Sequence, residues 1–257
     1  MLKTFNSLRY SGSTLTGLII WVLTMLSLPI LGWIMGEETL LRGMSVGVLA
    51  QFIAVMAILR QAWGWKRAIL VFAIVAGLAY LVELLGSTTG LLFGKYHYTG
   101  FLQPQVAGVP LLIPLAWMMM LPPAWAVAAL ITRRSGRDIR FIIVSALAFT
   151  AWDLFLDPQM VSWGFWVWEV PTQYYGIPLS NYAGWLVVSA LLGLIVNPRN
   201  LPVGPLALVY TLTWILQTIG QGIFWQQPGP ALVGFVCAGF FVAAALIRDR
   251  QSQPLGV

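Results

Sequence analysis

The 257-residue sequence contains a single cysteine and a single histidine. Without a second cysteine the chain cannot form an internal disulfide, and a multi-cysteine metal cluster is excluded. One histidine without a cysteine cluster also argues against a zinc or haem site. The lone Cys237 lies in an apolar run, where a cysteine usually behaves as a small hydrophobic residue. No Gly-rich dinucleotide fingerprint follows a predicted strand, so no dinucleotide cofactor is predicted. Nothing in the sequence demands a metal either, and a carboxylate site for a hard cation stays open as an alternative.

Charged residues are also scarce, at 9% of the positions, whereas hydrophobic residues make up 59%. A soluble domain has about 25% charged residues, so this composition is typical of an integral membrane protein. The net charge of +6 is therefore not interpreted as a nucleic-acid signature, because basic residues of membrane proteins collect on the cytoplasmic side. The first apolar run, residues 15–35, exceeds the ~7–15 residues of a cleavable signal-peptide core, so it is predicted to be a membrane-spanning segment and not a cleavable signal.

Eight apolar segments each approach the ~20 residues that a membrane-spanning helix needs. They cover residues 14–35, 41–61, 67–89, 110–131, 139–158, 181–197, 203–225 and 229–247. The sequence thus predicts an all-α, multi-pass cell-membrane protein with about eight transmembrane helices in one domain, residues 1–257. An even number of spans puts both termini on one side, and all basic residues except Arg42 and Lys95 then fall on that side. Both termini are therefore predicted to be cytoplasmic.

The third to sixth segments contain a weak internal repeat. Residues 64–131 and 134–197 form two units that run in the same direction, so we predict a parallel repeat of helices three and four on helices five and six. Repeats in membrane proteins commonly have a site at their interface, although a chance match of Gly, Pro and aromatic residues is the alternative. Shifts of 70 and then 68 residues superimpose Glu83 on Asp153, Tyr96 on Trp166, Tyr98 on Trp168, Gly108 on Gly176 and Trp117 on Trp185.

Acidic residues number only eight. Glu83, Asp153 and Asp157 lie inside apolar runs that contain no basic residue. Burial favours the neutral form of a carboxyl group, which can then hold a proton and deliver it as a general acid. The alternative is that these acids only fix helix packing through hydrogen bonds to Ser, Thr, Tyr or Trp. Solvated ends or helix caps are expected for four acids at segment ends: Glu37, Glu38, Asp138 and Asp249.

Position along the predicted helices puts the three internal acids in the outer half of the bilayer. Glu83 lies ~22 Å along the third helix, and Asp153 and Asp157 lie at similar or greater height on one face of the fifth. They lie under the loops 90–109 and 159–180. His97 in the first loop is interpreted either as an interfacial residue or as a proton relay. The second loop forms either an interfacial belt or a cation-tolerant pocket wall with its Trp163, Trp166, Trp168, Tyr174 and Tyr175.

Two stretches resemble signatures of a known family. The first is FGKYHYT at 93–99 followed by GVPLLIPLAWM at 108–118, and the second is DLFLDPQMV at 153–161, GFWVW at 164–168 and YGIPLSNYAGW at 175–185. Together they cover about the middle half of the chain and are similar to the carotenoid biosynthesis membrane family. Its members include carotenoid 1',2'-hydratases that act on γ-carotene or bisanhydrobacterioruberin. This sequence departs from the family pattern at two positions, with Thr172 in place of Gly and Tyr182 in place of Phe. Both departures affect the expected shape of the pocket more than its chemistry.

The resemblance implies a hydro-lyase that adds water to the terminal C1'–C2' double bond of a linear carotenoid end, without a cofactor. It also implies a carotenoid in the bilayer as substrate and a downstream carotenoid glycosyltransferase as partner. The predicted catalytic residues are Asp153, Asp157, Glu83 and His97, and the choice of proton donor among the acids stays open. The predicted substrate-binding residues are Tyr96, Tyr98, Trp117, Trp163, Trp166, Trp168, Tyr175, Asn181 and Trp185. Two alternatives are a carotenoid end-group cyclase and a proton-coupled transporter.

Overall fold

The computed structural model describes residues 12–251 except residues 171 and 173. Seven helices in this part of the chain are long and apolar enough to cross a membrane, which agrees with the predicted helical membrane protein. They are α2 (Gly12–Met35), α3 (Glu37–Thr89), α4 (Leu112–Thr132), α5 (Ile139–Ser162), α6 (Leu179–Val196), α7 (Val203–Ile219) with its π-helical continuation η1 (Gly220–Phe224), and α8 (Pro228–Gln251).

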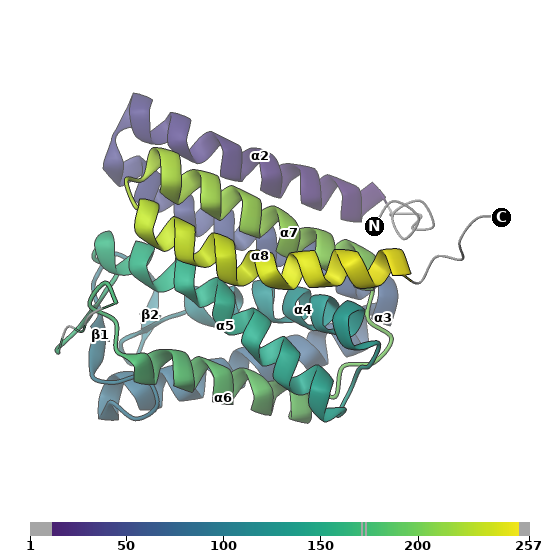
Figure 1. The fold of residues 1–257 in the computed structure, drawn as a ribbon. Helices are drawn as coiled ribbons and strands as arrows, with labels where there is room; N and C mark the ends of the chain where they lie inside the picture. The colour runs from purple at the N-terminus through teal and green to yellow at the C-terminus, as the bar shows by residue number, and fades with distance from the viewer. Residues whose placement is uncertain (1–11, 171, 173, 252–257) are drawn as a thin grey trace.

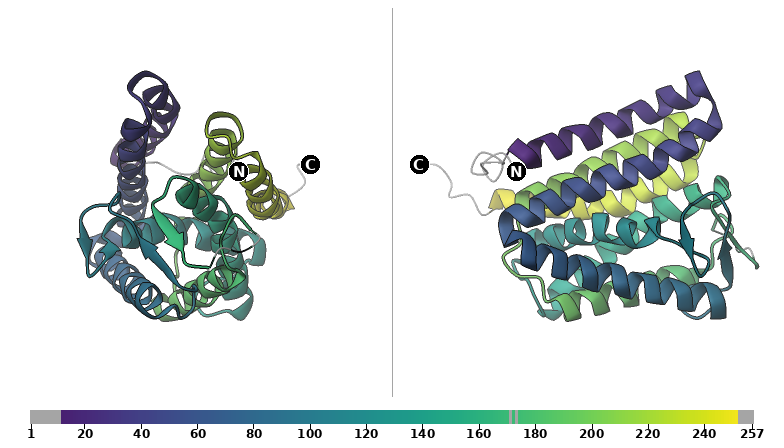
Figure 2. Two further views of the ribbon diagram at one scale, coloured as in Figure 1. Left: turned by 90° about the vertical axis from the view of Figure 1, so that its left-hand side faces the viewer. Right: turned by 180° about the vertical axis from the view of Figure 1, so that it is seen from behind.

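Helix α3 is not straight, because Gly64 interrupts it with a φ of 73° and a ψ of 168°. Phe52 and Phe72 would lie about 30 Å apart along an unbroken helix. Their ring centroids are instead 5.2 Å apart, so the helix doubles back on itself, as the right-hand view of Figure 2 shows. The two arms, residues 37–63 and 65–89, contain the predicted segments 41–61 and 67–89. A glycine permits this reversal because a positive φ strains any residue with a Cβ atom.

The two ends of the bundle differ in chemistry. Figure 1 shows the N-terminal end of α2 and the C-terminal end of α8 at one end, and the strands at the other. Basic side chains bind backbone carbonyls at the first end, where Arg67 donates to Arg199 at 2.8 Å. The carboxylate of Asp138 caps α5 there, as expected, by accepting from two backbone N–H groups, whereas Asp249 is buried and not solvated. Lys3 and Arg9, two basic residues of the orientation argument, lie outside the described residues.

Short strands join the loops at the opposite end, and the all-α prediction missed them. Strand β1 (Tyr96–Tyr98) pairs with β4 (Trp166–Trp168) in antiparallel register, with Tyr96 opposite Trp168. Two further backbone bonds extend this pair, from Thr99 N–H to the Phe165 carbonyl and from Glu169 N–H to the Lys95 carbonyl, each 2.9 Å long. A second small hairpin consists of β2 (Gln105–Val106) and β3 (Val109–Pro110).

Helix α4 lies in the centre of the molecule and is buried along most of its length. Two glycines then allow the loop after α3 to lie close to the helices. A Cβ atom on Gly86 of α3 would be 2.5 Å from the Phe93 ring, and one on Gly184 of α6 would be 2.7 Å from it. Phe93 is therefore wedged between α3 and α6. This wedge fixes the start of β1 over the helices that carry the internal acids.

Candidate active site

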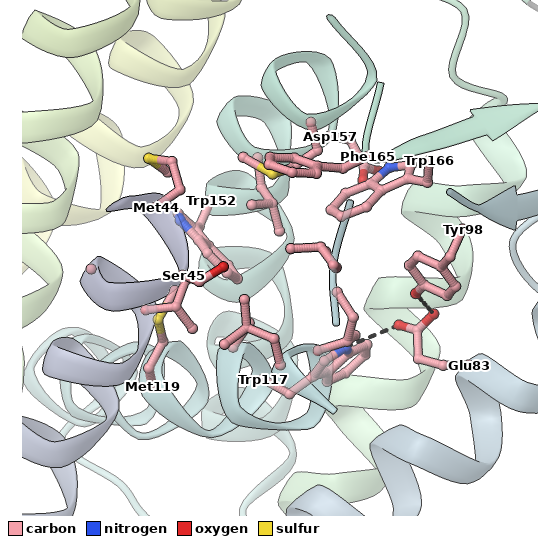
Figure 3. A pocket seen from close by; sticks show the side chains of 18 of the residues that line it. Met44, Ser45, Glu83, Tyr98, Trp117, Met119, Trp152, Asp157, Phe165 and Trp166 are labelled. Atoms are coloured by element: carbon pink, nitrogen blue, oxygen red, sulfur yellow. Dashed lines mark hydrogen bonds between the residues drawn. The ribbon is translucent and has the colours of Figure 1, made fainter. Parts of the chain in front are cut away.

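A cavity lies beneath the β1–β4 pair and extends across the bundle (Figure 3). It offers about 70 Å³ of space to the centre of a water-sized sphere, and most of its lining is apolar or aromatic. Figure 3 shows Glu83 and Tyr98 at one end, Met44 and Met119 at the other, and Trp117 between them. The acidic residues of its lining are Glu83 and Asp157. The cavity thus combines an apolar, aromatic wall with carboxyl groups at one end.

Glu83 is buried and accepts three hydrogen bonds. The hydroxyl groups of Tyr96 and Tyr98 donate to its Oε2 atom at 2.5 and 2.7 Å, and the indole N–H of Trp117 donates to Oε1 at 3.1 Å. Strand geometry explains the two tyrosines, because alternate residues of β1 face the same side. Burial and the neighbouring Glu83 raise the pKa of both Tyr96 and Tyr98, so the phenols stay protonated and act as donors. The Glu83 carboxyl group is therefore the acceptor in all three of these hydrogen bonds.

Asp153 and Asp157 lie one turn apart on α5 and share a partner from α6. The side-chain amide of Asn181 donates to Asp153 Oδ2 at 3.1 Å and also to Asp157 Oδ2. The two carboxyl groups lie within reach of each other, and the Trp166 indole reaches Asp157. Asp157 lines the cavity, whereas Asp153 lies behind it, fully buried and with its Oδ1 atom lacking a hydrogen-bond partner.

Pro158 lies inside helix α5 and interrupts its backbone hydrogen bonding near the two aspartates. A proline within a helix has no N–H group for the carbonyl four residues earlier. That carbonyl belongs to Leu154, and it accepts a hydrogen bond from the hydroxyl group of Tyr174 at 3.1 Å. The loop after β4 is thereby tied to the helix turn that carries both aspartates. A free carbonyl is expensive in an apolar setting, so this bond stabilises the interrupted turn.

The internal acids have no cationic partner among the described residues. Ion pairs join Arg42 to Glu38 and Arg134 to Asp138 near the two ends of the bundle. Two buried carboxyl groups in contact cannot both ionise without a compensating charge. Asp153 and Asp157 therefore share at least one proton. The described residues contain no group of three or more His, Cys, Asp or Glu side chains that could hold a metal ion.

Stacked aromatic rings form the wall between the two ends of the cavity. Trp117 stacks on Trp185 with ring centroids 4.6 Å apart, and the Phe149 ring lies 5.1 Å from each of them. Trp152 meets Trp185 edge-on at 6.0 Å. Aromatic faces attract cations, so this wall suits a positively charged intermediate as well as a conjugated chain.

The structure brings together most of the predicted site residues, but three lie elsewhere. His97 is exposed, because it points to the opposite side of β1 from Tyr96 and Tyr98. Tyr175 is 48% exposed. Trp163 contacts Trp225 at 5.3 Å and does not line the cavity. The predicted residues on the cavity lining are Glu83, Tyr96, Tyr98, Trp117, Asp157, Trp166, Trp168, Asn181 and Trp185.

Sequence reasoning missed several residues that line the cavity. The helical pattern could have identified Trp152, because Trp152, Leu156 and Met160 occur at four-residue spacing and line the cavity together. Gln51 and Gln217 are buried amides in otherwise apolar helices, which is a detectable signal. Gln51 donates to Thr213 Oγ1 at 3.1 Å.

Comparison with known proteins adds a family to this geometry. Residues 43–241 match the family described as carotenoid biosynthesis protein. The chain belongs to this family. The match contains both aspartates, Glu83 and the loops that cover them. No solved structure matches the chain.

A curated relative agrees with this assignment. The chain is 33% identical over 196 residues to a protein named bisanhydrobacterioruberin hydratase from Haloarcula japonica. The aligned region covers 72% of this chain and 65% of the relative, so the chain spans about two thirds of the length of the protein that it resembles.

Proposed function

We propose that this member of the carotenoid biosynthesis family is a carotenoid 1',2'-hydratase, a hydro-lyase that needs no cofactor. It adds water to the terminal C1'–C2' double bond of a linear carotenoid end, as in γ-carotene or lycopene, and forms a tertiary alcohol. The observation that carries the proposal is the convergence of Glu83 and Asp157 on one aromatic-walled apolar cavity. The name of the relative supports hydration as the reaction.

The first step in this proposal is protonation of the double bond. Asp157 is the proton donor because it lines the cavity, whereas Asp153 stands behind it. The Asp157 carboxyl group transfers its proton to C2', the π bond breaks, and a tertiary carbocation remains at C1'. Asp153 and the Asn181 amide position the donor, and the proton shared by the pair replenishes it. General-acid groups contribute about 10²–10⁴-fold to such a step.

Water capture completes the reaction. A water molecule attacks C1', the new C–O bond forms, and the oxonium ion loses a proton to Glu83 or to the Asp157 carboxylate. Return of that proton to Asp157 restores the starting state, so the net change is the addition of one water. Glu83 suits the acceptor role because its three hydrogen bonds all come from donors. The stacked Trp117 and Trp185 rings stabilise the carbocation before capture.

The membrane placement belongs to the same proposal. Counting the two arms of α3 separately gives eight spans, with both termini cytoplasmic and the cavity in the outer half of the cell membrane. The end of the bundle that is rich in Arg lies opposite the strands, which supports this orientation. A carotenoid in the bilayer then reaches the site without passing through water. The product alcohol is the acceptor that a downstream carotenoid glycosyltransferase requires.

The parallel repeat is also part of the proposal, and backbone pairing supports it. A shift of 70 residues makes Glu169 the equivalent of Thr99 and Phe165 the equivalent of Lys95. The backbone bond from Thr99 to Phe165 is therefore the equivalent of the bond from Glu169 to Lys95. The register of β1 and β4 does the same, since it pairs Tyr96 with Trp168 and Tyr98 with Trp166. Both patterns are expected for two units related by a two-fold axis through the middle of the strand pair.

Expression in a bacterium that accumulates lycopene or γ-carotene tests the function. The wild-type chain should yield a pigment heavier than its precursor by one water. A product of unchanged mass would instead indicate the cyclase, and no new pigment would contradict both. In the same cells, Asp157→Asn should reduce the hydrated pigment by about 10²-fold or more, and Glu83→Gln should also reduce it.

Matched amide substitutions outside the cavity serve as controls. Glu38→Gln breaks only an exposed i,i+4 pair with Arg42, which contributes little to stability, and should leave pigment formation unchanged. Asp153→Asn should retain more activity than Asp157→Asn, because it leaves the cavity-facing donor in place. Full product from all three site variants would show that the acids do not carry the chemistry.

A further inference from the structure

A second hollow opens on the side of the bundle, between α2 and the end of α7. Its lining includes Leu26 and Ile30 of α2, Ile219 of α7, and the η1 residues Gly220 and Phe224. Leu26 and Ile30 are 53% and 51% exposed. An apolar groove of this kind faces the lipid when the helices span a membrane. The left-hand view of Figure 2 shows α2 projecting from the body of the molecule beside α7.

The groove lies next to the cavity that contains the acids. Met25 lines both hollows. On α7 the neighbouring residues Gln217 and Leu216 line the cavity and the groove respectively. Met25 therefore lies between the two hollows, and a chain that ran from Glu83 and Asp157 past this side chain would reach the outside between α2 and α7.

The local backbone at the groove is specialised. Residues Gly220–Phe224 form a π-helical turn, a distortion that often occurs at functional sites. A Cβ atom on Gly220 would lie 2.4 Å from the Trp225 ring, so only glycine lets that indole lie against the turn. Trp33 and Phe224 meet at 5.3 Å and join α2 to η1 at one limit of the groove. The groove is thus built from fixed aromatic contacts.

From these observations we propose that the α2–α7 groove holds the polyene chain of the substrate while its end is hydrated at the acids. This inference rests on the proposed function. A carotenoid with one end at Glu83 and Asp157 is far longer than the internal cavity, and the rest of its chain has no aqueous phase. The β1–β4 pair covers the cavity at the outer end, so the chain must leave sideways. The groove provides an apolar surface next to the site, separated from it by the flexible side chain of Met25.

Substrate length gives the first test. Purified variants in lipid vesicles are assayed with a full-length linear carotenoid and with a short isoprenoid that has the same terminal double bond. Leu26→Trp, which fills the groove, should lower the ratio of long-substrate to short-substrate rates at least tenfold. Leu23→Trp is the control, because Leu23 is a similarly exposed apolar residue of α2 that does not line the groove, and the ratio should not change. An unchanged ratio for Leu26→Trp would refute the groove.

A binding measurement separates this inference from the proposed function. A polyene with a photoactivatable diazirine at its far end is irradiated with the wild-type protein, and the labelled peptides are identified by mass spectrometry. Labels within residues 25–33 or 216–225, competed by unmodified carotenoid, would support the groove even if no hydration occurred. Labels on other helices, or labels displaced equally well by ordinary phospholipid, would refute it. Absence of hydration by the wild-type chain would instead refute the proposed function.

Discussion

Replacing Tyr98 with Phe tests whether Glu83 carries a negative charge in the folded protein. The substitution keeps the ring and removes the hydroxyl group that donates to Glu83 Oε2 at 2.7 Å. A hydrogen bond to a charged group contributes about 1.5–3 kcal/mol to stability, whereas one between neutral groups contributes about 0.5–1.5 kcal/mol. Tyr96 and Trp117 still donate to the carboxylate in the variant. We therefore expect Tyr98→Phe to lower the free energy of unfolding by about 2 kcal/mol.

Tyr210 supplies a matched control. Its hydroxyl group is buried and donates to the backbone carbonyl of Ala148, also at 2.7 Å. Tyr210→Phe removes the same atom from a bond of the same length, but the acceptor is neutral. The expected loss is about 1 kcal/mol. The two variants thus differ in the charge of the acceptor.

Both losses can be measured by reversible unfolding in mixed micelles, with SDS as the denaturant and far-UV circular dichroism as the signal. Tyr98→Phe should lose about 1 kcal/mol more than Tyr210→Phe if Glu83 is ionised. Equal losses would show that the Glu83 carboxyl group is protonated. Glu83 would then be unable to accept the proton of the attacking water, and the division of roles between Glu83 and Asp157 would be wrong.

Two further substitutions test the frame around the site. Asn181→Leu removes the amide shared by the two aspartates. It should lower hydration about tenfold or more, because a small misplacement of a catalytic group is costly. Pigment analysis measures the yield, and a wild-type yield would contradict this expectation. Gly184→Ala puts a Cβ atom 2.7 Å from the Phe93 ring and should reduce stability by about 1–3 kcal/mol, measured by the same SDS titration. An unchanged midpoint would mean that Phe93 moves freely.

The sequence predicts the helices well because the membrane imposes a strong pattern on them. Every predicted segment overlaps a helix, and the gap between 41–61 and 67–89 contains the reversal at Gly64. The three acids were identifiable because a carboxyl group in an apolar run is costly unless it is used. The predicted end of the seventh segment, 203–225, coincides with η1, but nothing in its composition indicated a π-helix.

The loops were harder to predict because their patterns are short. Tyr96, His97 and Tyr98 alternate as a strand does, and this period puts the histidine on the outer side. Sequence reasoning assigned all three residues to one site because it treated the loop as irregular. Trp163 and Tyr175 were assigned to the pocket by density of aromatic residues alone, yet tertiary contacts decide which rings face a cavity.

The proposed two-fold relation explains how acids 70 residues apart can serve one cavity. The axis passes between His97 and Val167, which face each other at the centre of the strand pair, and Trp117 stacks on its repeat equivalent Trp185. Under that relation Asp153 is the equivalent of Glu83, and Asp157, one turn away from Asp153 on α5, is the aspartate that lines the cavity with Glu83. Their surroundings differ, since Glu83 has three donors and Asp153 shares one amide with Asp157. In the proposed mechanism, this unequal hydrogen bonding lets the aspartate pair hold the proton while Glu83 accepts one.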